Sequence, residues 1–288
     1  MEAVLTQAFN GLVYSSVLFL LAAGLSLIFG LMNVVNIAHG SFYMLGAFFG
    51  LGVVALTGNF WLAVLIAPII VAAIGVAVET GFIRPLYRRH HLDQVLLTFG
   101  FTLVFYDLVE TFGGMQIYTL ATPGILAGSI HILGNVIPVY HLFLVALGFG
   151  VGGSLWWFID RSRIGAMVRA GVDDSNMAAG VGINVGLLFT SIFAVGAALA
   201  GLAGVAAGPE LGIYAGMDVE ILIPAFIVIV IGGTGSLRGA FGGSLIVGEA
   251  DTFGKAYLPE MAMFLIYILM IAVLLTRPDG LFGRAKAT

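Results

Sequence analysis

The chain has 288 residues, of which 60% are hydrophobic and 9% are charged, and its formal net charge is −4. Soluble domains are about 45–50% apolar and about 25% charged, so this composition excludes a soluble enzyme and a disordered chain. The absence of cysteine excludes a disulfide framework and a thiol nucleophile, and the 11 basic residues indicate no nucleic-acid partner. We therefore predict an all-α, polytopic membrane protein surrounded by lipid.

About eight to nine hydrophobic segments divide the sequence. A helix that crosses a bilayer needs about 20 mostly apolar residues, and several segments are shorter, so we expect some to be broken or re-entrant. No stretch between them can build a soluble core, which predicts one transmembrane domain over residues 1–288. In chain order, the segments are Phe9–Leu31, Ser41–Leu56, Phe60–Glu79, Val95–Phe112, His141–Ile159, Val185–Ala207, Ile221–Gly233, Ala240–Phe253 and Met261–Leu275.

The basic residues indicate an orientation. Alternating spans place ten of the eleven Lys and Arg residues on one face and only Lys255 on the other. Because basic loops stay in the cytoplasm, this asymmetry predicts a cytoplasmic C-terminus. The opposite face has the loop Gly113–Tyr140, which lacks Lys and Arg and is expected to cap the helices. The same face is predicted to carry the acidic residues Glu210, Asp218, Glu220 and Glu260.

A polar interruption follows the first hydrophobic segment. Unpaired polar groups in hydrocarbon cost several kcal/mol, so these side chains should face protein, a wet cavity or the membrane surface. Glycine and asparagine also suit a break in a helix, and broken helices commonly mark transport pathways. An ordinary cytoplasmic turn between two spans explains the pattern equally well. The residues concerned are Asn33, Asn36, His39, Gly40 and Ser41.

The polar stretch Asp160–Asn184 lies on the predicted cytoplasmic face and contains a pattern for a short helix over 173–182. Asp173 or Ser175 can cap this helix, because their side chains accept unpaired backbone N–H groups. A small apolar surface follows, and Gly182 can end the helix. Such a helix suits docking of a partner, or it lies on the membrane surface. The apolar surface consists of Met177, Ala178, Ala179 and Val181.

A second interruption is the glycine-rich run 231–243, between two short apolar segments. Such segments are typical of a re-entrant pair or of two half-helices. The alternative is a tight hairpin that brings Arg238 to the surface. We expect Arg238 at the surface and the glycines packed. The residues at the predicted break are Gly232, Gly233, Thr234 and Gly235.

The sequence indicates no catalytic site, cofactor or metal site. It has no G-x-x-x-x-G-K-[ST] loop for nucleotide phosphates, and its five histidines show no metal-binding spacing. A secondary transporter that works alone usually places ionisable residues at mid-membrane to bind a coupling ion. The candidates within the hydrophobic segments lie towards their outer ends, and they are Asp107, Glu110, Glu249 and Asp251.

These motifs together resemble the Liv-type (LivH-like) branched-chain amino-acid permease family of ATP-binding-cassette importers. One matching segment contains the element Asn36-Ile-Ala-His39-Gly40, and another runs from Arg169 to Asn184. The glycine-rich run 231–243 and the ending Arg277-Pro-Asp-Gly-Leu-Phe-Gly283 complete the resemblance, which covers nearly the whole chain in order.

The resemblance implies a permease bundle that forms half of a pathway in the bacterial inner membrane. The solute would be an amino acid or similar small polar molecule, with branched-chain amino acids first; urea, amides and carboxylates remain open. The implied partners are a second permease subunit, two cytoplasmic ATPases and a periplasmic solute-binding protein. The rival interpretation is a secondary transporter or channel working alone. ATPase coupling is expected at Arg169, Asp173, Asp174, Met177, Ala178 and Gly182, and the residues of the two interruptions are expected to shape the pathway.

Overall fold

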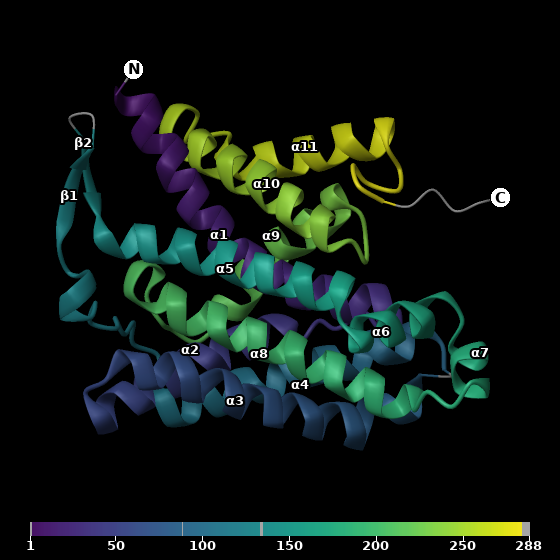
Figure 1. The fold of residues 1–288 in the computed structure, drawn as a ribbon. Helices are drawn as coiled ribbons and strands as arrows, with labels where there is room; N and C mark the ends of the chain where they lie inside the picture. Colours follow the sequence, from purple (N-terminus) through teal and green to yellow (C-terminus); the bar gives the residue numbers. More distant parts are fainter. Residues whose placement is uncertain (1, 88, 133–134, 284–288) are drawn as a thin grey trace.

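The computed structural model describes residues 2–87, 89–132 and 135–283, without the side chains of Glu2, Ile132, Val172, Asp173 and Ser175. The long helices run roughly side by side and form a bundle (Figure 1). Their bounds are α1 Glu2–Met32, α2 His39–Thr57, α3 Phe60–Val78, α4 His91–Gly113, α5 Val139–Arg161, α6 Arg163–Asp173, α7 Ser175–Gly180, α8 Val185–Leu211, α9 Met217–Gly232, α10 Leu237–Tyr257 and α11 Ala262–Thr276.

The helices confirm the prediction of an all-α, polytopic membrane protein. Among the described residues, six helices are long and apolar enough to cross a membrane: α1, α2, α3 with its extension to Leu86, α4, α5 and α8. The pair α9 and α10 meets the same criterion only as one bent unit, with 119° between the two helices, and α11 is a shorter apolar helix. Each predicted hydrophobic segment coincides with, or largely overlaps, one of these helices.

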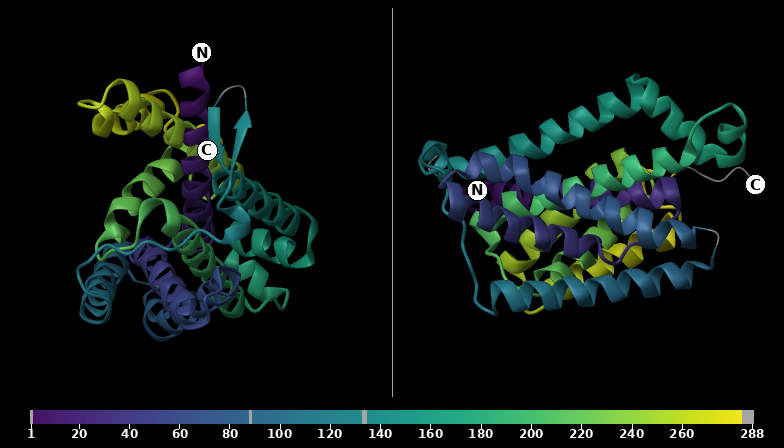
Figure 2. Two further views of the ribbon diagram at one scale, coloured as in Figure 1. Left: turned by 90° about the vertical axis from the view of Figure 1, so that its left-hand side faces the viewer. Right: turned by 90° about the horizontal axis from the view of Figure 1, so that it is seen from below.

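Helix α1 forms the centre of the bundle. It packs against α5, α8, α9 and α10, and residues 15–26 are all buried. A helix that is apolar on all sides is buried in this way, because no polar face turns it towards water. Small residues let the backbones approach closely: a Cβ on Gly24 would lie 2.6 Å from the carbonyl oxygen of Gly196 in α8. By contrast, α4 and α5 lie at the margin of the bundle (Figure 2). They expose many apolar side chains, as expected of a surface in lipid.

The two ends of the bundle differ. One end, here called the basic end, carries α6, α7 and the C-terminal segment 277–283; the other, the hairpin end, carries an antiparallel pair of short strands (Figure 1). The strands are β1, Ser129–Ile132, and β2, Asn135–Pro138. Residues 114–118 are tied to the turn between α8 and α9, where Tyr118 and Ile213 exchange two backbone hydrogen bonds of 2.8 Å.

Two local predictions need correction. The loop Gly113–Tyr140 contains the strand pair, which the turn residues of this loop did not reveal. The short helix predicted over 173–182 is present as α7, but it starts after Asp174, which replaces Asp173 or Ser175 as the cap, and the helix α6 before it was not predicted. The extended backbone of Asp174, with φ −155° and ψ 102°, ends α6. Its side chain then caps α7, so one residue both stops a helix and starts the next.

Candidate functional site

The first polar interruption is a re-entrant linker. Helix α1 ends at Met32, and the next residue, Asn33, has a left-handed φ of 52°, a conformation that asparagine tolerates better than most residues. Asn33 contacts His91 at the start of α4, whereas the backbone N–H of Ile37 donates to Thr98, seven residues further along α4. Seven residues of α-helix rise about 10 Å, so the linker runs from the basic end into the bundle. Helix α2 therefore begins inside the bundle.

Two side chains of this region are buried without full hydrogen bonding. His39 is fully buried, and its Nε2 lies 3.0 Å from the carbonyl oxygen of Leu21, while Nδ1 has no partner among the described residues. Asn36 is also fully buried, and within the described part of the chain neither its Oδ1 nor its Nδ2 has a partner. An unsatisfied buried polar group costs about 1–3 kcal/mol. The backbone is non-helical over residues 33–38, between α1 and α2, and the buried polar groups of this region carry a cost that packing alone does not require.

Ser41 contacts an acidic residue that sequence analysis assigned elsewhere. Its hydroxyl donates to Oδ2 of Asp218 across 2.9 Å, and both side chains are buried. Sequence analysis placed Asp218 on the face opposite the basic loops, and it predicted neither the burial of this side chain nor its contact with Ser41. Gly40 permits this approach, because a Cβ there would lie 2.3 Å from the backbone oxygen of Asp218. No local pattern reveals a contact between residues so far apart in sequence.

Helices α2 and α9 thus both begin inside the bundle, and their first turns meet. The N-terminus of a helix carries a partial positive charge, which favours a carboxylate such as Asp218 in the first turn of α9. Oδ1 of Asp218 has no hydrogen-bond partner in the part of the chain that the structure describes. Discontinuous helices whose ends meet within a membrane domain are typical of solute sites in transporters. Asn36, His39, Ser41 and Asp218 are the buried polar side chains of these two helix starts.

The glycine-rich run forms the turn between α9 and α10. Gly233 and Gly235 have φ of 101° and 75°, left-handed values that favour glycine. A Cβ on Gly232 would lie 2.0 Å from the carbonyl oxygen of Gly239, so the two helices touch directly. The C-terminal segment packs on the turn, because the N–H of Leu281 donates to the carbonyl of Ile231 across 2.8 Å. The turn is a packed helix break.

Two side chains of this run, those of Thr234 and Arg238, lie at the surface. Thr234 is exposed, and Gly235 packs against Gly30 at the end of α1. Arg238 is exposed and lies 3.6 Å from a carboxylate oxygen of Asp160. The expected arrangement, with Arg238 at the surface and the glycines packed, agrees with these contacts.

The α6–α7 segment presents apolar side chains at the basic end. Oδ1 of Asp174 accepts the N–H groups of Asn176 and Met177, both at 2.9 Å, which fixes the start of α7. Met177 is 67% exposed and Val181 is 72% exposed, whereas Ala178 is buried against the rest of the chain. A short rigid helix with an exposed apolar tip is a suitable docking element.

Two other residues of the predicted coupling set hold the segment in place. Gly182 has φ of 89° and ends the turn after α7. Arg169 donates to the carbonyl oxygen of Ile159 and lies 4.0 Å from a carboxylate oxygen of Asp160, so it joins α6 to α5. The backbone of Asp173 ends α6, and its side chain lies outside the described part of the chain.

Sequence analysis missed a second buried carboxylate. Glu79 lies at the end of the predicted segment Phe60–Glu79, and its side chain is fully buried and hydrogen-bonded to Arg84, Tyr87 and Thr190. Asp107 is exposed, and Glu110, Glu249 and Asp251 are only partly buried. The view that those four are the only ionisable candidates in the spans is therefore wrong. The one available signal was an acid followed by Arg84 and Tyr87 at the end of an apolar run.

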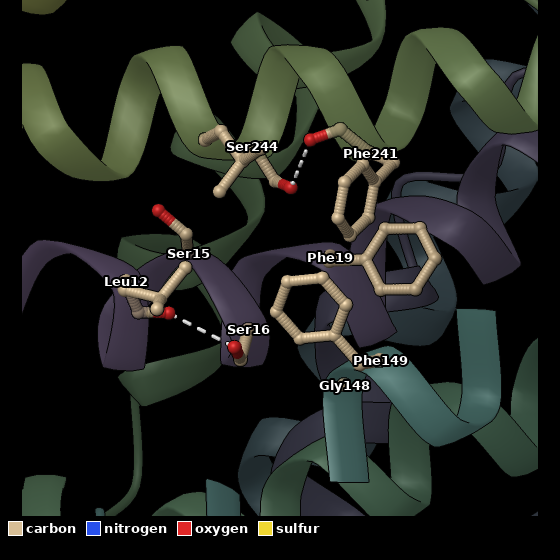
Figure 3. Close-up of a pocket in the computed structure, with 9 residues that line it drawn as sticks. Leu12, Ser15, Ser16, Phe19, Gly148, Phe149, Phe241 and Ser244 are labelled. Atoms are coloured by element: carbon tan, nitrogen blue, oxygen red, sulfur yellow. Dashed lines mark hydrogen bonds between the residues drawn. The ribbon is translucent and has the colours of Figure 1, made fainter. Parts of the chain in front are cut away.

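A small cleft lies between α1, α5 and α10 (Figure 3). Its hydroxyl groups belong to Ser15, Ser16 and Ser244, and each donates to a carbonyl of its own helix. Phe19 and Phe241 meet edge to face at 5.3 Å. The cleft is therefore a packing groove between helices, and we assign no ligand to it.

The chain matches the family described as branched-chain amino acid transport system / permease component over residues 7–274. The high-affinity branched-chain amino acid transport system permease protein BraD of Pseudomonas aeruginosa is 33% identical, and the match covers 98% of this chain and 96% of BraD. The corresponding permease proteins LivH of Salmonella typhimurium and Escherichia coli are 31% and 32% identical over the same shares. No solved structure matches. The chain therefore belongs to the family of branched-chain amino acid transport permease components.

Proposed function

We propose that the chain is the permease subunit of an ATP-binding-cassette importer and supplies half of a pathway through the bacterial inner membrane. Residues 1–288 act as one permease domain, with a cytoplasmic coupling loop near 160–184. A second permease subunit completes the pathway, a periplasmic protein delivers the solute, and two cytoplasmic ATPases supply the energy. The observation that carries this proposal is the capped helix α7, which presents Met177 and Val181 at the basic end.

The charges support the proposed orientation. Among the described residues, Arg161, Arg163 and Arg169 flank or lie within α6, and Arg238 reaches Asp160 at the end of α5. Lys255 lies near the other end of α10. Because basic segments stay in the cytoplasm, this distribution favours a cytoplasmic basic end and a cytoplasmic C-terminus.

A branched-chain amino acid is the solute class that the relatives' names support. We assign the buried helix starts at Asn36, His39, Ser41 and Asp218 to the pathway, with Asn33 and Gly40 as the break that places them. The turn at 232–235 joins α9 to α10, and we assign it as a second helix break in the half of the pathway that this subunit supplies. None of these residues performs chemistry on the solute.

The mechanism follows from linkage. A conformational change requires a ligand that binds two states with different affinity, and ATP meets this condition when the ATPases close only around it. Closure draws the α7 helices of the two permease subunits together and opens the pathway outwards. Hydrolysis of ATP lets the ATPases separate, and the pathway returns to its starting conformation. The coupling residues in this scheme are Arg169, Asp173, Asp174, Met177, Ala178 and Gly182.

The test is co-purification of this chain with its candidate ATPases from a mild detergent. We expect the wild-type chain to retain two ATPase subunits and Met177→Asp to lose them, because a charge replaces the exposed apolar tip. Met115→Asp is the matched control, since Met115 is similarly exposed, at 74%, but lies towards the hairpin end. Uptake by the purified chain alone, driven by a proton or sodium gradient without ATPases, would establish the secondary transporter instead.

A further inference from the structure

Glu79 is a buried carboxylate at the basic end of α3 with a full set of donors. Oε1 accepts from Arg84 Nε at 3.2 Å and from the Tyr87 hydroxyl at 2.5 Å. Oε2 accepts from Arg84 Nη2 at 3.1 Å and from the Thr190 hydroxyl at 2.8 Å. Burial raises the pKa of the Tyr87 hydroxyl, so this group stays protonated and keeps its role as a donor. These contacts satisfy both oxygens of Glu79.

A change of helix type produces this arrangement. Helix α3 continues as a π-helix over Glu79–Ile83, in which the backbone N–H of Arg84 bonds to the carbonyl of Glu79 five residues earlier. In an α-helix, residues five apart point about 140° away from each other. The wider turn instead brings Arg84 over Glu79. Such π-helical turns are rare and occur frequently at functional sites.

Thr190 connects this network to the α6–α7 segment. It lies in the second turn of α8, and α8 begins at Val185, five residues after the end of α7. The Thr190 hydroxyl has a single proton, which it donates to Glu79 or to the carbonyl of Gly186, while Arg84 donates to its oxygen. Phe189 adds an edge-to-face contact with Tyr87 at 5.6 Å between ring centroids. The first turns of α8 are thereby joined to the end of α3.

Two helices that are joined by directional hydrogen bonds move together, whereas two helices held by apolar packing alone can slide past each other. We propose that Glu79 is a positioning residue that fixes the start of α8 to α3, so that movement of the α6–α7 segment displaces both helices together. This inference rests on the proposed function, since it requires ATPases that move α7. It assigns to Glu79 a role in coupling that no motif of the sequence indicated.

The first test measures solute transported per ATP hydrolysed by the whole complex in liposomes, with leucine as the probe. We expect Glu79→Gln and Thr190→Val to lower this ratio roughly tenfold, because each variant loses a hydrogen bond to a charged group and such a bond contributes a factor of about that size. The basal rate of ATP hydrolysis should remain at the wild-type level. Ser191→Ala is the control, because the Ser191 hydroxyl is exposed and, among the described residues, bonds only to the carbonyl of Leu187 in its own helix. A ratio within twofold of wild type for both variants overturns the proposal.

A distance measurement separates coupling from folding. The chain has no cysteine, so spin labels can be placed at Thr80→Cys on the π-helix and Leu187→Cys on α8, both exposed positions. We expect the distance between the labels to stay fixed when ATP binds to the wild-type complex, and to change or broaden in the Glu79→Gln complex. An unchanged distance in the Glu79→Gln complex overturns the proposal. Failure of the Thr190→Val chain to assemble with its partner subunits also overturns it, because the network would then be purely structural. Failure of the wild-type chain to bind ATPases would instead refute the proposed function.

Discussion

The crossing of α2 and α8 allows a sharp test of helix packing. A Cβ on Gly46 of α2 would lie 2.3 Å from the carbonyl oxygen and 2.4 Å from the Cα of Gly201 in α8. Carbon atoms in contact are about 3.5 Å apart, so Gly46→Ala must separate the two backbones by roughly 1 Å. The obstacle is backbone, which cannot rotate away as a side chain can. We therefore expect Gly46→Ala to lower the free energy of unfolding by about 1–3 kcal/mol.

Gly52→Ala is the matched control in the same helix. No atom outside its own helix lies within 4 Å of a Cβ at Gly52. Alanine favours a helix over glycine by at most about 1 kcal/mol, so this variant should be unchanged or slightly more stable.

The assay is thermal unfolding of both purified variants in one detergent at one heating rate. A loss of about 2 kcal/mol corresponds to a lowering of Tm by roughly 4–8 °C for a domain of this size. If Gly46→Ala unfolds at the same temperature as Gly52→Ala, the close approach of α2 and α8 is not present in the protein, and the reasoning fails.

Three further predictions concern the helix starts and turns. Ser41→Ala removes the donor to the buried Asp218 carboxylate and should lower the free energy of unfolding by about 1.5–3 kcal/mol. When Ser41→Ala is combined with Asp218→Asn, the two losses should not add, and a double-mutant cycle on thermal stability measures this coupling. Asp174→Ala removes the cap of α7 and should destabilise that helix by about 1 kcal/mol; faster hydrogen exchange confined to the amides of α7 would show it, and unchanged exchange would contradict the capping role. Gly233→Ala puts a side chain at a φ of 101° and 2.5 Å from the backbone nitrogen of Gly283, so Tm should fall; an equal Tm would rule out this contact with the C-terminal segment.

Much of the fold follows from the sequence, because the hydrocarbon of a bilayer imposes a compositional rule on each segment. A span must be apolar over its length and must satisfy its backbone hydrogen bonds internally. Segments such as Val185–Ala207 meet this rule without help from neighbours, and α8 is found there. The helix breaks after Met32 and at Gly233 were also predictable, since asparagine and glycine adopt left-handed backbone conformations.

The site was predictable only in part. Asn36, His39 and Ser41 stand out as polar residues in an apolar stretch, and the structure buries all three. Asp218 and Glu79 do not stand out, because each lies at the edge of an apolar run, where an acidic residue is normally solvated. Their burial depends on partners far away in sequence: Ser41 for Asp218, and Thr190 for Glu79.

The sequence by itself therefore determined the class of protein, the approximate helices, the places where they break and the family resemblance that the comparisons confirmed. Only the tertiary structure decided how deep each helix begins. It placed the starts of α2 and α9 together inside the bundle and joined the start of α8 to the end of α3. The physical reason is that hydropathy is a property of each segment alone, whereas the depth of a helix start is set by close contacts between segments. Those contacts are made by glycines such as Gly40 and by single buried hydrogen bonds, which add almost nothing to the hydropathy pattern.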